Sequence, residues 1–171
     1  NFTISGVTTS LCNKGIYLNT VSSYDLLNSY NLYNGISVDI TNAHLMKGEN
    51  VYSLGAQVSH GIQIDTIENS KIDNCVSAGN YSDGVHVTNS KNFVLNGTLI
   101  QNGNDAIYME DCSEIVFDNT ATESNIANGV EAVNCNNITL KTIASNGNGG
   151  NGLSLVGTSS LEVVGGYYTE N

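Results

Sequence analysis

Aliphatic residues alternate with polar residues in short runs that recur along the whole chain. Each run follows the pattern small residue, aliphatic residue, any residue, aliphatic residue. The small residues, called anchors below, are Gly15, Gly35, Gly61, Gly84, Ala106, Gly129 and Gly152. Successive anchor numbers differ by 20, 26, 23, 22, 23 and 23. Alternation with a period of two within each short run predicts short β-strands with one buried face.

A second alternating run follows the first in most periods, for example at residues 93–95, 115–117, 138–140 and 161–163. A weaker third run precedes an Asn/Gly-rich turn that leads to the next anchor. Two or three short strands per period of about 22 residues, stacked on their equivalents in the next period, predict an all-β parallel β-helix of about seven coils. Leucine-rich repeats and hexapeptide β-helices are excluded, because the chain has neither a regular leucine framework nor a six-residue period.

The alternation also predicts which side chains face outward. The positions one and three residues after each anchor are expected in the core, and the position between them outside. This outward row contains Tyr17, Ser37, Gln63, His86, Tyr108, Glu131 and Ser154. The residues before the anchors form a second row with Lys14, Asn34, His60, Asp83, Asp105, Asn128 and Asn151. We expect function on these two rows, because the remaining positions are core or turn.

The charge and amino-acid composition exclude several classes of binding partner. The 171 residues include 16 acidic residues, five lysines and no arginine, which gives a formal charge of −11. Nucleic acid and anionic membrane surfaces are therefore excluded as expected partners, because no basic stripe exists to bind phosphates. No apolar stretch approaches the length of a membrane span. The 26 asparagines, 18 glycines and absence of proline argue against a helical bundle.

The glycine-aliphatic-x-aliphatic anchors, the Asn-rich turns and strands such as residues 136–140 resemble the right-handed parallel β-helix of pectin lyase-like proteins. The resemblance covers nearly the whole chain and implies the fold. It does not select a function, because this fold carries polysaccharide lyases, glycoside hydrolases, epimerases, phage spikes and non-catalytic surface modules.

One local motif is similar to polygalacturonase-like hydrolases. Residues 80–84 resemble their Asn-Thr-Asp-Gly motif, and residues 103–106 resemble Gly-Asp-Asp one coil later. This resemblance implies Asp83 and Asp105 as a catalytic pair that polarises a water. Asn104, however, stands in the place of the proton-donating aspartate, and an amide is no general acid. The structural alternative is that an aspartate before the anchor suits a tight turn between coils.

A second candidate site is a sugar-binding face. An aromatic ring at Tyr108 could stack on a sugar while neighbouring polar groups bind its hydroxyls. The candidate binding residues are Gln63, His86, Tyr108 and Glu131, and the candidate partner is a neutral glycan. The alternative is a solvated strand face without a ligand.

No cofactor is expected from the sequence. His44 and His60 show no partner spacing typical of a metal site, so no metal ligands are assigned. Asp39, Asp65 and Glu110 share the fourth position after their anchors and, together with Asp111, could offer oxygens to Ca²⁺. A turn-forming role is the favoured interpretation of these carboxylates.

Two further sets of residues share a register. Cys112 and Cys135 both take the sixth position after their anchors and are expected to be neighbours on adjacent coils, with both thiols reduced. Asn80, Asn102, Asn125 and Asn148 have spacings of 22, 23 and 23 and are expected to form a hydrogen-bonded ladder.

The sequence thus predicts one parallel β-helix domain over residues 1–171, expected to be a segment of a longer chain because neither end shows a cap. The leading functional hypothesis is a non-catalytic scaffold or glycan-contacting module of a secreted, cell-surface or virion-surface protein. The alternatives are a polygalacturonase-like glycoside hydrolase with an altered site and a structural protein assembled end to end through its coils.

Overall fold

The computed structural model describes residues 2–171, and within this range it contains strands and turns but no helix. Accordingly, no helix of the described residues is long and apolar enough to cross a membrane. The strands are β1 (Phe2–Ser5), β2 (Thr8–Ser10), β3 (Lys14–Leu32), β4 (Ile36–Leu54), β5 (Ile62–Asp65), β6 (Glu68–Ala78), β7 (Val85–Thr88), β8 (Lys91–Ile100), β9 (Ile107–Glu110), β10 (Ser113–Glu123), β11 (Val130–Val133), β12 (Asn136–Asn146), β13 (Leu153–Val156) and β14 (Ser159–Thr169).

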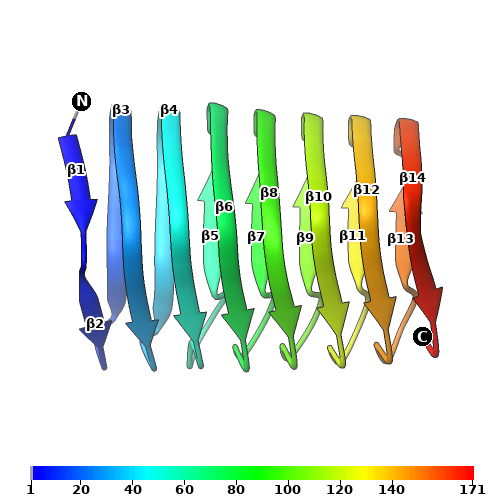
Figure 1. Cartoon of the computed structure of the whole chain (residues 1–171), viewed down its shortest axis with the longest axis horizontal. Helices are drawn as coiled ribbons and strands as arrows, with labels where there is room; N and C mark the ends of the chain where they lie inside the picture. The colour runs from blue at the N-terminus through cyan, green and yellow to red at the C-terminus, as the bar shows by residue number, and fades with distance from the viewer. Residues whose placement is uncertain (1) are drawn as a thin grey trace.

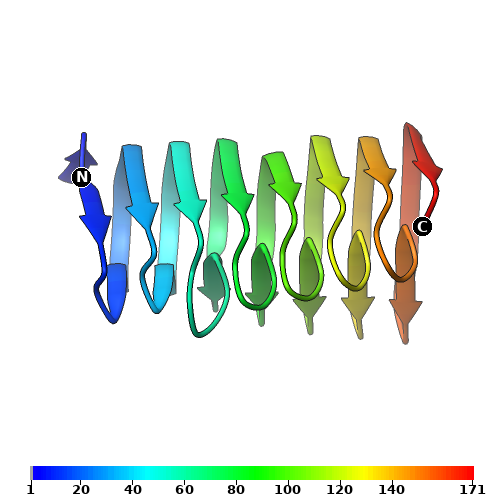
Figure 2. The same ribbon diagram turned by 90° about the horizontal axis from the view of Figure 1, so that it is seen from below.

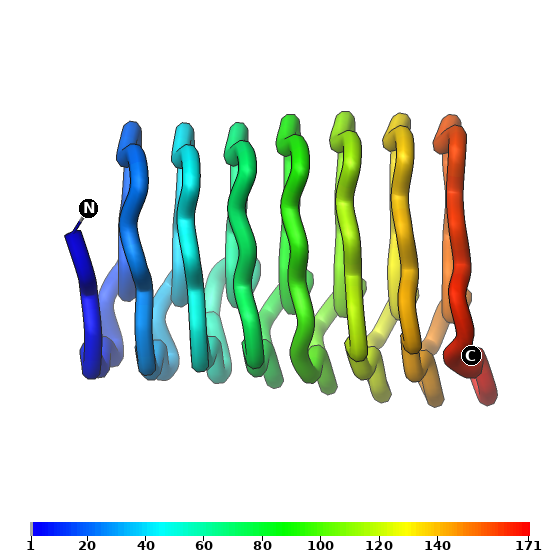
Figure 3. The backbone as a smooth tube through the Cα atoms, turned by 45° about the horizontal axis from the view of Figure 1, so that its top comes forward, coloured from blue at the N-terminus to red at the C-terminus, as the bar shows by residue number. Residues whose placement is uncertain are grey.

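The strands wind into a solenoid, which confirms the predicted parallel β-helix. Successive coils lie side by side along the long axis, with the two termini at opposite ends (Figures 1 and 3). From residue 61 onward each coil contributes one short strand and one long strand. The short strands β5, β7, β9, β11 and β13 form one face, and the long strands β6, β8, β10, β12 and β14 form the other. Figure 2 shows the loops that connect the two faces.

Parallel pairing places equivalent residues of neighbouring coils next to one another. Ile62 pairs with Val85, Val85 with Ile107, and Ile107 with Val130, and all of these side chains are completely buried. The core is therefore a stack of aliphatic side chains that runs the length of the solenoid, joined by Phe93 and Phe117 from the long strands. The five anchors from Gly61 to Gly152 have the register that the spacing predicts.

The predicted register of the second coil was wrong by two positions. Ile16 pairs with Val38, and Val38 pairs with Ile62, so the residue equivalent to Gly15 and Gly61 is Ser37 and not Gly35. This register buries Val38 and Ile40, and it also buries Ser37, which was expected in the outward row. Asp39 takes that outward place.

Residues with a left-handed backbone mark the bends of each coil. After the short strands, the chain turns at Thr66, Asn89, Asp111 and Asn134, whose φ angles lie between 50° and 55°. The backbone N–H of each of these residues donates to a backbone carbonyl of the next coil. Asn89, for example, donates to the carbonyl of Glu110. Asparagine is frequent at these bends because it tolerates this conformation better than most residues.

The coil that begins at Gly84 is one residue shorter than its neighbours, and β8 absorbs the difference. Leu95 pairs with Ile72 and Phe117, but Gly97 already pairs with Cys75 and Thr120. One residue of β8 therefore lies opposite two residues on each side, as in a β-bulge. A Cβ atom on Gly97 would lie 2.2 Å from the carbonyl oxygen of Cys75, so this close approach requires glycine.

The predicted asparagine ladder is present inside the solenoid. Asn80 donates from Nδ2 to Oδ1 of Asn102 at 2.8 Å, Asn102 donates to Asn125 at 2.9 Å, and Asn125 donates to Asn148 at 2.8 Å. The ladder continues from Asn148 to Asn171. The Oδ1 atoms of Asn102, Asn125 and Asn148 also accept the backbone N–H of the preceding ladder member, which satisfies buried backbone groups at the bend.

Cys112 and Cys135 occupy equivalent buried positions of neighbouring coils, as the shared register predicted. All four cysteines are free. Cys12 is exposed, whereas Cys75 is completely buried, and this burial raises the pKa of its thiol to about 12.

The ladder predicts a large difference between two asparagine-to-alanine substitutions. Asn102→Ala would leave buried donors and acceptors of Asn80 and Asn125 without partners, so we expect a loss of about 2–4 kcal/mol in the free energy of unfolding. Asn136→Ala, on an exposed strand position with one side-chain hydrogen bond, is the matched control and should cost less than about 1 kcal/mol. Urea unfolding of both variants tests this, and equal losses would contradict the structural role of the ladder.

The cysteine environments predict the course of alkylation. In denaturant without reductant, iodoacetamide should label all four cysteines. In the native protein, only Cys12 should react rapidly, because the others are buried. Intact mass measurement decides both points, with a pre-reduced sample as the control. A denatured mass lacking two labels that appear after reduction would show a disulfide and contradict the free Cys112–Cys135 pair.

Candidate functional site

Polar and aromatic side chains line the outer surface of the short-strand face. Gln63 on β5, His86 on β7, Tyr108 on β9 and Glu131 on β11 occupy equivalent positions of successive coils. All four side chains are half-buried, because the neighbouring coils cover their flanks. The structure therefore brings the predicted binding residues into one row along the solenoid axis.

Three rings in this region stack on one another. The ring of His60, which comes from the turn before β5, lies 4.0 Å from the ring of His86, and the ring of His86 lies 4.8 Å from the ring of Tyr108. The interplanar angles are 27° and 11°. The result is a continuous aromatic strip across three coils. We call this strip, together with Gln63 and Glu131, the ring row.

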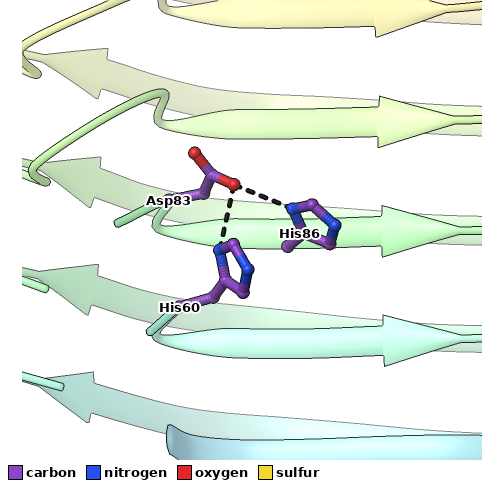
Figure 4. A group of neighbouring side chains, drawn as sticks. All are labelled: His60, Asp83 and His86. Atoms are coloured by element: carbon purple, nitrogen blue, oxygen red, sulfur yellow. Dashed lines mark hydrogen bonds and ion pairs between the residues drawn. The ribbon is translucent and has the colours of Figure 1, made fainter. Parts of the chain in front are cut away.

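Asp83 lies in the turn before β7 and points its carboxylate toward both histidines (Figure 4). Its Oδ2 atom is 2.8 Å from Nδ1 of His86 and 2.9 Å from Nδ1 of His60. The contact with His86 has hydrogen-bond geometry, but Nδ1 of His60 is buried without a hydrogen-bond partner despite its proximity to Oδ2. The other carboxylate oxygen, Oδ1, accepts from the amide of Asn104 at 2.7 Å and from the backbone N–H of Asp105 at 3.1 Å.

These contacts keep Asp83 ionised. Only 2% of its surface is exposed, and burial by itself would raise the pKa. The contacts with His60 and His86, together with the amide of Asn104, outweigh burial and hold the pKa of Asp83 well below its usual range. Asp83 is thus a fixed negative charge between two imidazoles.

Asp105 is the equivalent residue of the next coil, and its pKa is shifted in the opposite direction. Burial, with repulsion from Asp83 and Glu131, raises the pKa of Asp105 to about 6, although the backbone N–H of Asn128 donates to its Oδ1 at 2.6 Å and opposes the shift. The two carboxyl groups therefore differ in their affinity for a proton, although they occupy equivalent places in the repeat.

Asn104 connects the two acids. Its Nδ2 atom lies 2.7 Å from Oδ1 of Asp83 and 3.4 Å from Oδ2 of Asp105. The place where the hydrolase resemblance implied a shared water is thus bridged by an amide group of the protein. Asp83 and Asp105 also accept backbone N–H groups of the following coil, which is the turn role considered from the sequence.

The remaining members of the ring row are held by hydrogen bonds. The hydroxyl of Tyr108 donates to Glu110 at 3.1 Å, and burial followed by this contact raises the pKa of Tyr108 to about 12. The amide of Asn128 donates to Oε2 of Glu131 at 2.9 Å. Both side chains are therefore held in a defined orientation.

The contact of His60 with His86 was not predicted from the sequence. The two histidines take different positions of the repeat, and only the coil register shows that the residue before one anchor can reach the outward residue of the next coil. His60, Asp83 and His86 offer one donor atom each within 4.8 Å of one another, so they could hold a metal ion.

The Ca²⁺ alternative lost its geometric basis with the corrected register. Asp39 pairs with Gln63, and Asp65 pairs with Thr41 and Thr88, so the two carboxylates do not stack. Asp39 forms an ion pair with Lys14 at 2.5 Å, and Asp65 accepts hydrogen bonds from Thr88 and Asn89. Asp65 ends β5 just before the bend at Thr66 and fits the turn interpretation, whereas Asp39 lies within β4 and not at a turn.

Solved structures with a similar fold come from several kinds of protein. A double mutant of the periplasmic alginate epimerase AlgG is 18% identical, with a TM-score of 0.78 over 91% of this chain and 48% of that chain. The A-module of the mannuronan C-5 epimerase AlgE6 from Azotobacter vinelandii is 12% identical, with a TM-score of 0.63 over 98% of this chain and 55% of that chain. Tailspike protein 2 of the Escherichia coli bacteriophage CAB120 is 16% identical, with a TM-score of 0.57 over 95% of this chain and 24% of that chain.

The chain thus spans about half the length of the two epimerase structures and about a quarter of the tailspike. At these identities the likeness shows the fold alone. A search of curated protein sequences finds no significant match. The sequence profile of the right-handed β-helix region matches residues 1–167, nearly the whole chain. Together with the parallel coils and their stacked core, this match shows that the chain belongs to the family of right-handed β-helix region proteins.

Proposed function

We propose that this chain is a non-catalytic, glycan-contacting module and that the ring row is its binding surface. The observation that carries the proposal is the stack of His60, His86 and Tyr108, with ring separations of 4.0 and 4.8 Å. Because the stacked rings cover one another's faces, they offer their edges to a sugar, and these edges combine apolar C–H groups with polar atoms while nearby groups bind the sugar hydroxyls. Glu131 and Gln63 flank the rings and supply those groups.

The row has a direction that fits a linear polymer. It runs along the solenoid axis and passes through four successive coils, so one glycan chain could contact the same type of position several times. Repeated weak contacts along one ligand add to a useful affinity without a deep pocket. An extended polysaccharide is therefore a better match to this surface than a single small sugar.

Charge favours a neutral glycan. The chain carries a formal charge of −11, and Glu131 and Asp105 lie in or beside the row. The lysine nearest in register, Lys14 on β3, is paired with Asp39. A uronate polymer would bring further negative charge to this surface and would be repelled.

The relatives support a location outside the cytoplasm. One structural neighbour is named as a periplasmic alginate epimerase, and another is a phage tailspike. We therefore place this module in a secreted, cell-surface or virion-surface protein, where glycans are accessible.

The binding surface predicts the effect of removing one ring. On a glycan array, the native protein should bind neutral polysaccharides, and Tyr108→Ala should weaken the best of these interactions by about tenfold or more. Central aromatic residues of binding surfaces commonly contribute at least about 1.4 kcal/mol. Tyr33→Ala, which removes an exposed tyrosine outside the ring row, is the matched control and should bind like the native protein. Absence of any glycan binding, or equal binding by both variants, would refute the proposal.

A polygalacturonase-like hydrolase is the second candidate, and one observation favours it. The pKa of Asp83 is lowered while the pKa of Asp105 is raised to about 6, and such a separation is typical of an acid and a base in one site. Against it, both carboxyl groups are at most 2% exposed, and Asn104 occupies the donor position. Loss of a positioned general acid lowers rates by about 10²- to 10⁴-fold.

We therefore expect no measurable hydrolysis of polygalacturonate. The comparison is native protein against Asp83→Ala and Asp105→Asn in a reducing-sugar assay, with circular dichroism to check that both variants are folded. Turnover by the native chain that disappears in both folded variants would establish the hydrolase and disprove the non-catalytic interpretation.

A further inference from the structure

Three potential metal ligands converge on the outer surface between the turn before β5 and strand β7. Nδ1 of His60 and Nδ1 of His86 lie 2.9 and 2.8 Å from the same carboxylate oxygen, Oδ2 of Asp83 (Figure 4). Two imidazoles and one carboxylate are a donor set that binds Zn²⁺ and other divalent transition metals in proteins. We propose that His60, Asp83 and His86 form a binding site for one divalent transition-metal ion of the Zn²⁺ type.

The distances from Oδ2 of Asp83 to the two Nδ1 atoms are compatible with a common ion. Zn²⁺ bonds to imidazole nitrogen and carboxylate oxygen are about 2.0–2.2 Å long. Donors separated as Oδ2 is from each Nδ1 atom would then subtend an angle of about 90° at the ion, which is usual in five- and six-coordinate sites. A tetrahedral site would require the donors to separate by only about 0.5 Å more, well within the rotation of an imidazole ring.

The state of His60 points independently to a missing ligand. Its Nδ1 atom is buried but forms no hydrogen bond, even though Oδ2 of Asp83 is within 2.9 Å. Buried polar atoms of native proteins are almost always paired, and an unpaired nitrogen costs free energy. A cation bound between Nδ1 of His60 and Oδ2 would give this buried nitrogen a partner, whereas Oδ2 is already in hydrogen-bond contact with Nδ1 of His86.

The surroundings fix the ligands in place. The amide of Asn104 and the backbone N–H of Asp105 bind Oδ1 of Asp83 and so direct Oδ2 toward the histidines. The stacking of His60 on His86, and of His86 on Tyr108, holds both rings in orientation. Such supporting contacts around the ligands are a feature of real metal sites and change affinity when they are removed.

The site is accessible and surrounded by negative charge. The side chains of His60 and His86 are 18% and 22% exposed, so an ion can enter from solvent and can keep a water or another ligand. Asp105 occupies the equivalent position of the next coil, and Glu131 lies beyond Tyr108 in the ring row. Both carboxyl groups favour a cation at this place. The metal proposal does not depend on glycan binding.

Direct titration tests the site. Tag-free protein is treated with a chelator, dialysed and titrated with Zn²⁺ and, separately, with Co²⁺. We expect one equivalent of each metal and a visible d–d absorption band for bound Co²⁺. His60→Gln and His86→Gln should each weaken binding at least tenfold, and Asn104→Ala should weaken it by about 10- to 100-fold because Asp83 loses its support. His44→Gln, a histidine paired with Glu68 outside the site, is the matched control and should bind like the native protein.

X-ray absorption of the Zn²⁺-loaded native chain needs no substitution and should show scattering from two imidazole rings. A spectrum without imidazole scattering, a native protein that binds no stoichiometric metal, or folded His60→Gln and His86→Gln variants that bind as tightly as the His44→Gln control would each overturn the proposal.

Discussion

Parallel stacking of equivalent residues is the constraint on which this structure depends. Each inner coil donates and accepts backbone hydrogen bonds with the coils on both sides, so a side chain can be placed only where its counterparts on the neighbouring coils can accept it. In the core this constraint selects aliphatic residues on aliphatic residues. At the buried bend it selects asparagine, whose amide both donates to and accepts from an identical neighbour. The fold is therefore a one-dimensional repetition in which every coil stabilises only its neighbours.

The candidate site is a product of the same repetition. Rings on equivalent or near-equivalent positions must come to lie about one strand spacing apart, and the observed separations of 4.0 and 4.8 Å follow from it. The aspartates before the anchors likewise accept the backbone N–H groups of the next coil. Equivalent residues of different coils have different neighbours. Asp83 faces two imidazoles, whereas Asp105 faces other carboxylates. In such a fold, a candidate site arises where equivalent residues of successive coils have different neighbours.

The parallel β-helix could be predicted from the sequence, because few folds combine a hydrophobic period of two with a repeat of about 23 residues. The row from Gln63 to Glu131 and the asparagine ladder followed directly from spacing. The second coil could not be aligned correctly with its neighbours from the sequence. Gly35 fits the anchor pattern, and the burial of Ser37 is visible only in the packed structure. The contact of His60 with His86 was also out of reach, since it joins two different positions of the repeat and depends on the side-chain rotamers at a turn.

The shortened coil at β8 shows how such a chain can change its length. A residue is missing between Leu95 and Gly97, yet the pairing with both neighbours is restored within two positions, and the coils farther away keep their register. Because each coil contacts only the next, a deletion or insertion is corrected where it occurs and does not propagate. A lineage of such proteins can therefore gain or lose single residues, and accept longer loops at the bends, while the surface that runs along the axis stays aligned. In this solenoid, variation in length is compatible with an unbroken row of equivalent surface residues along the axis.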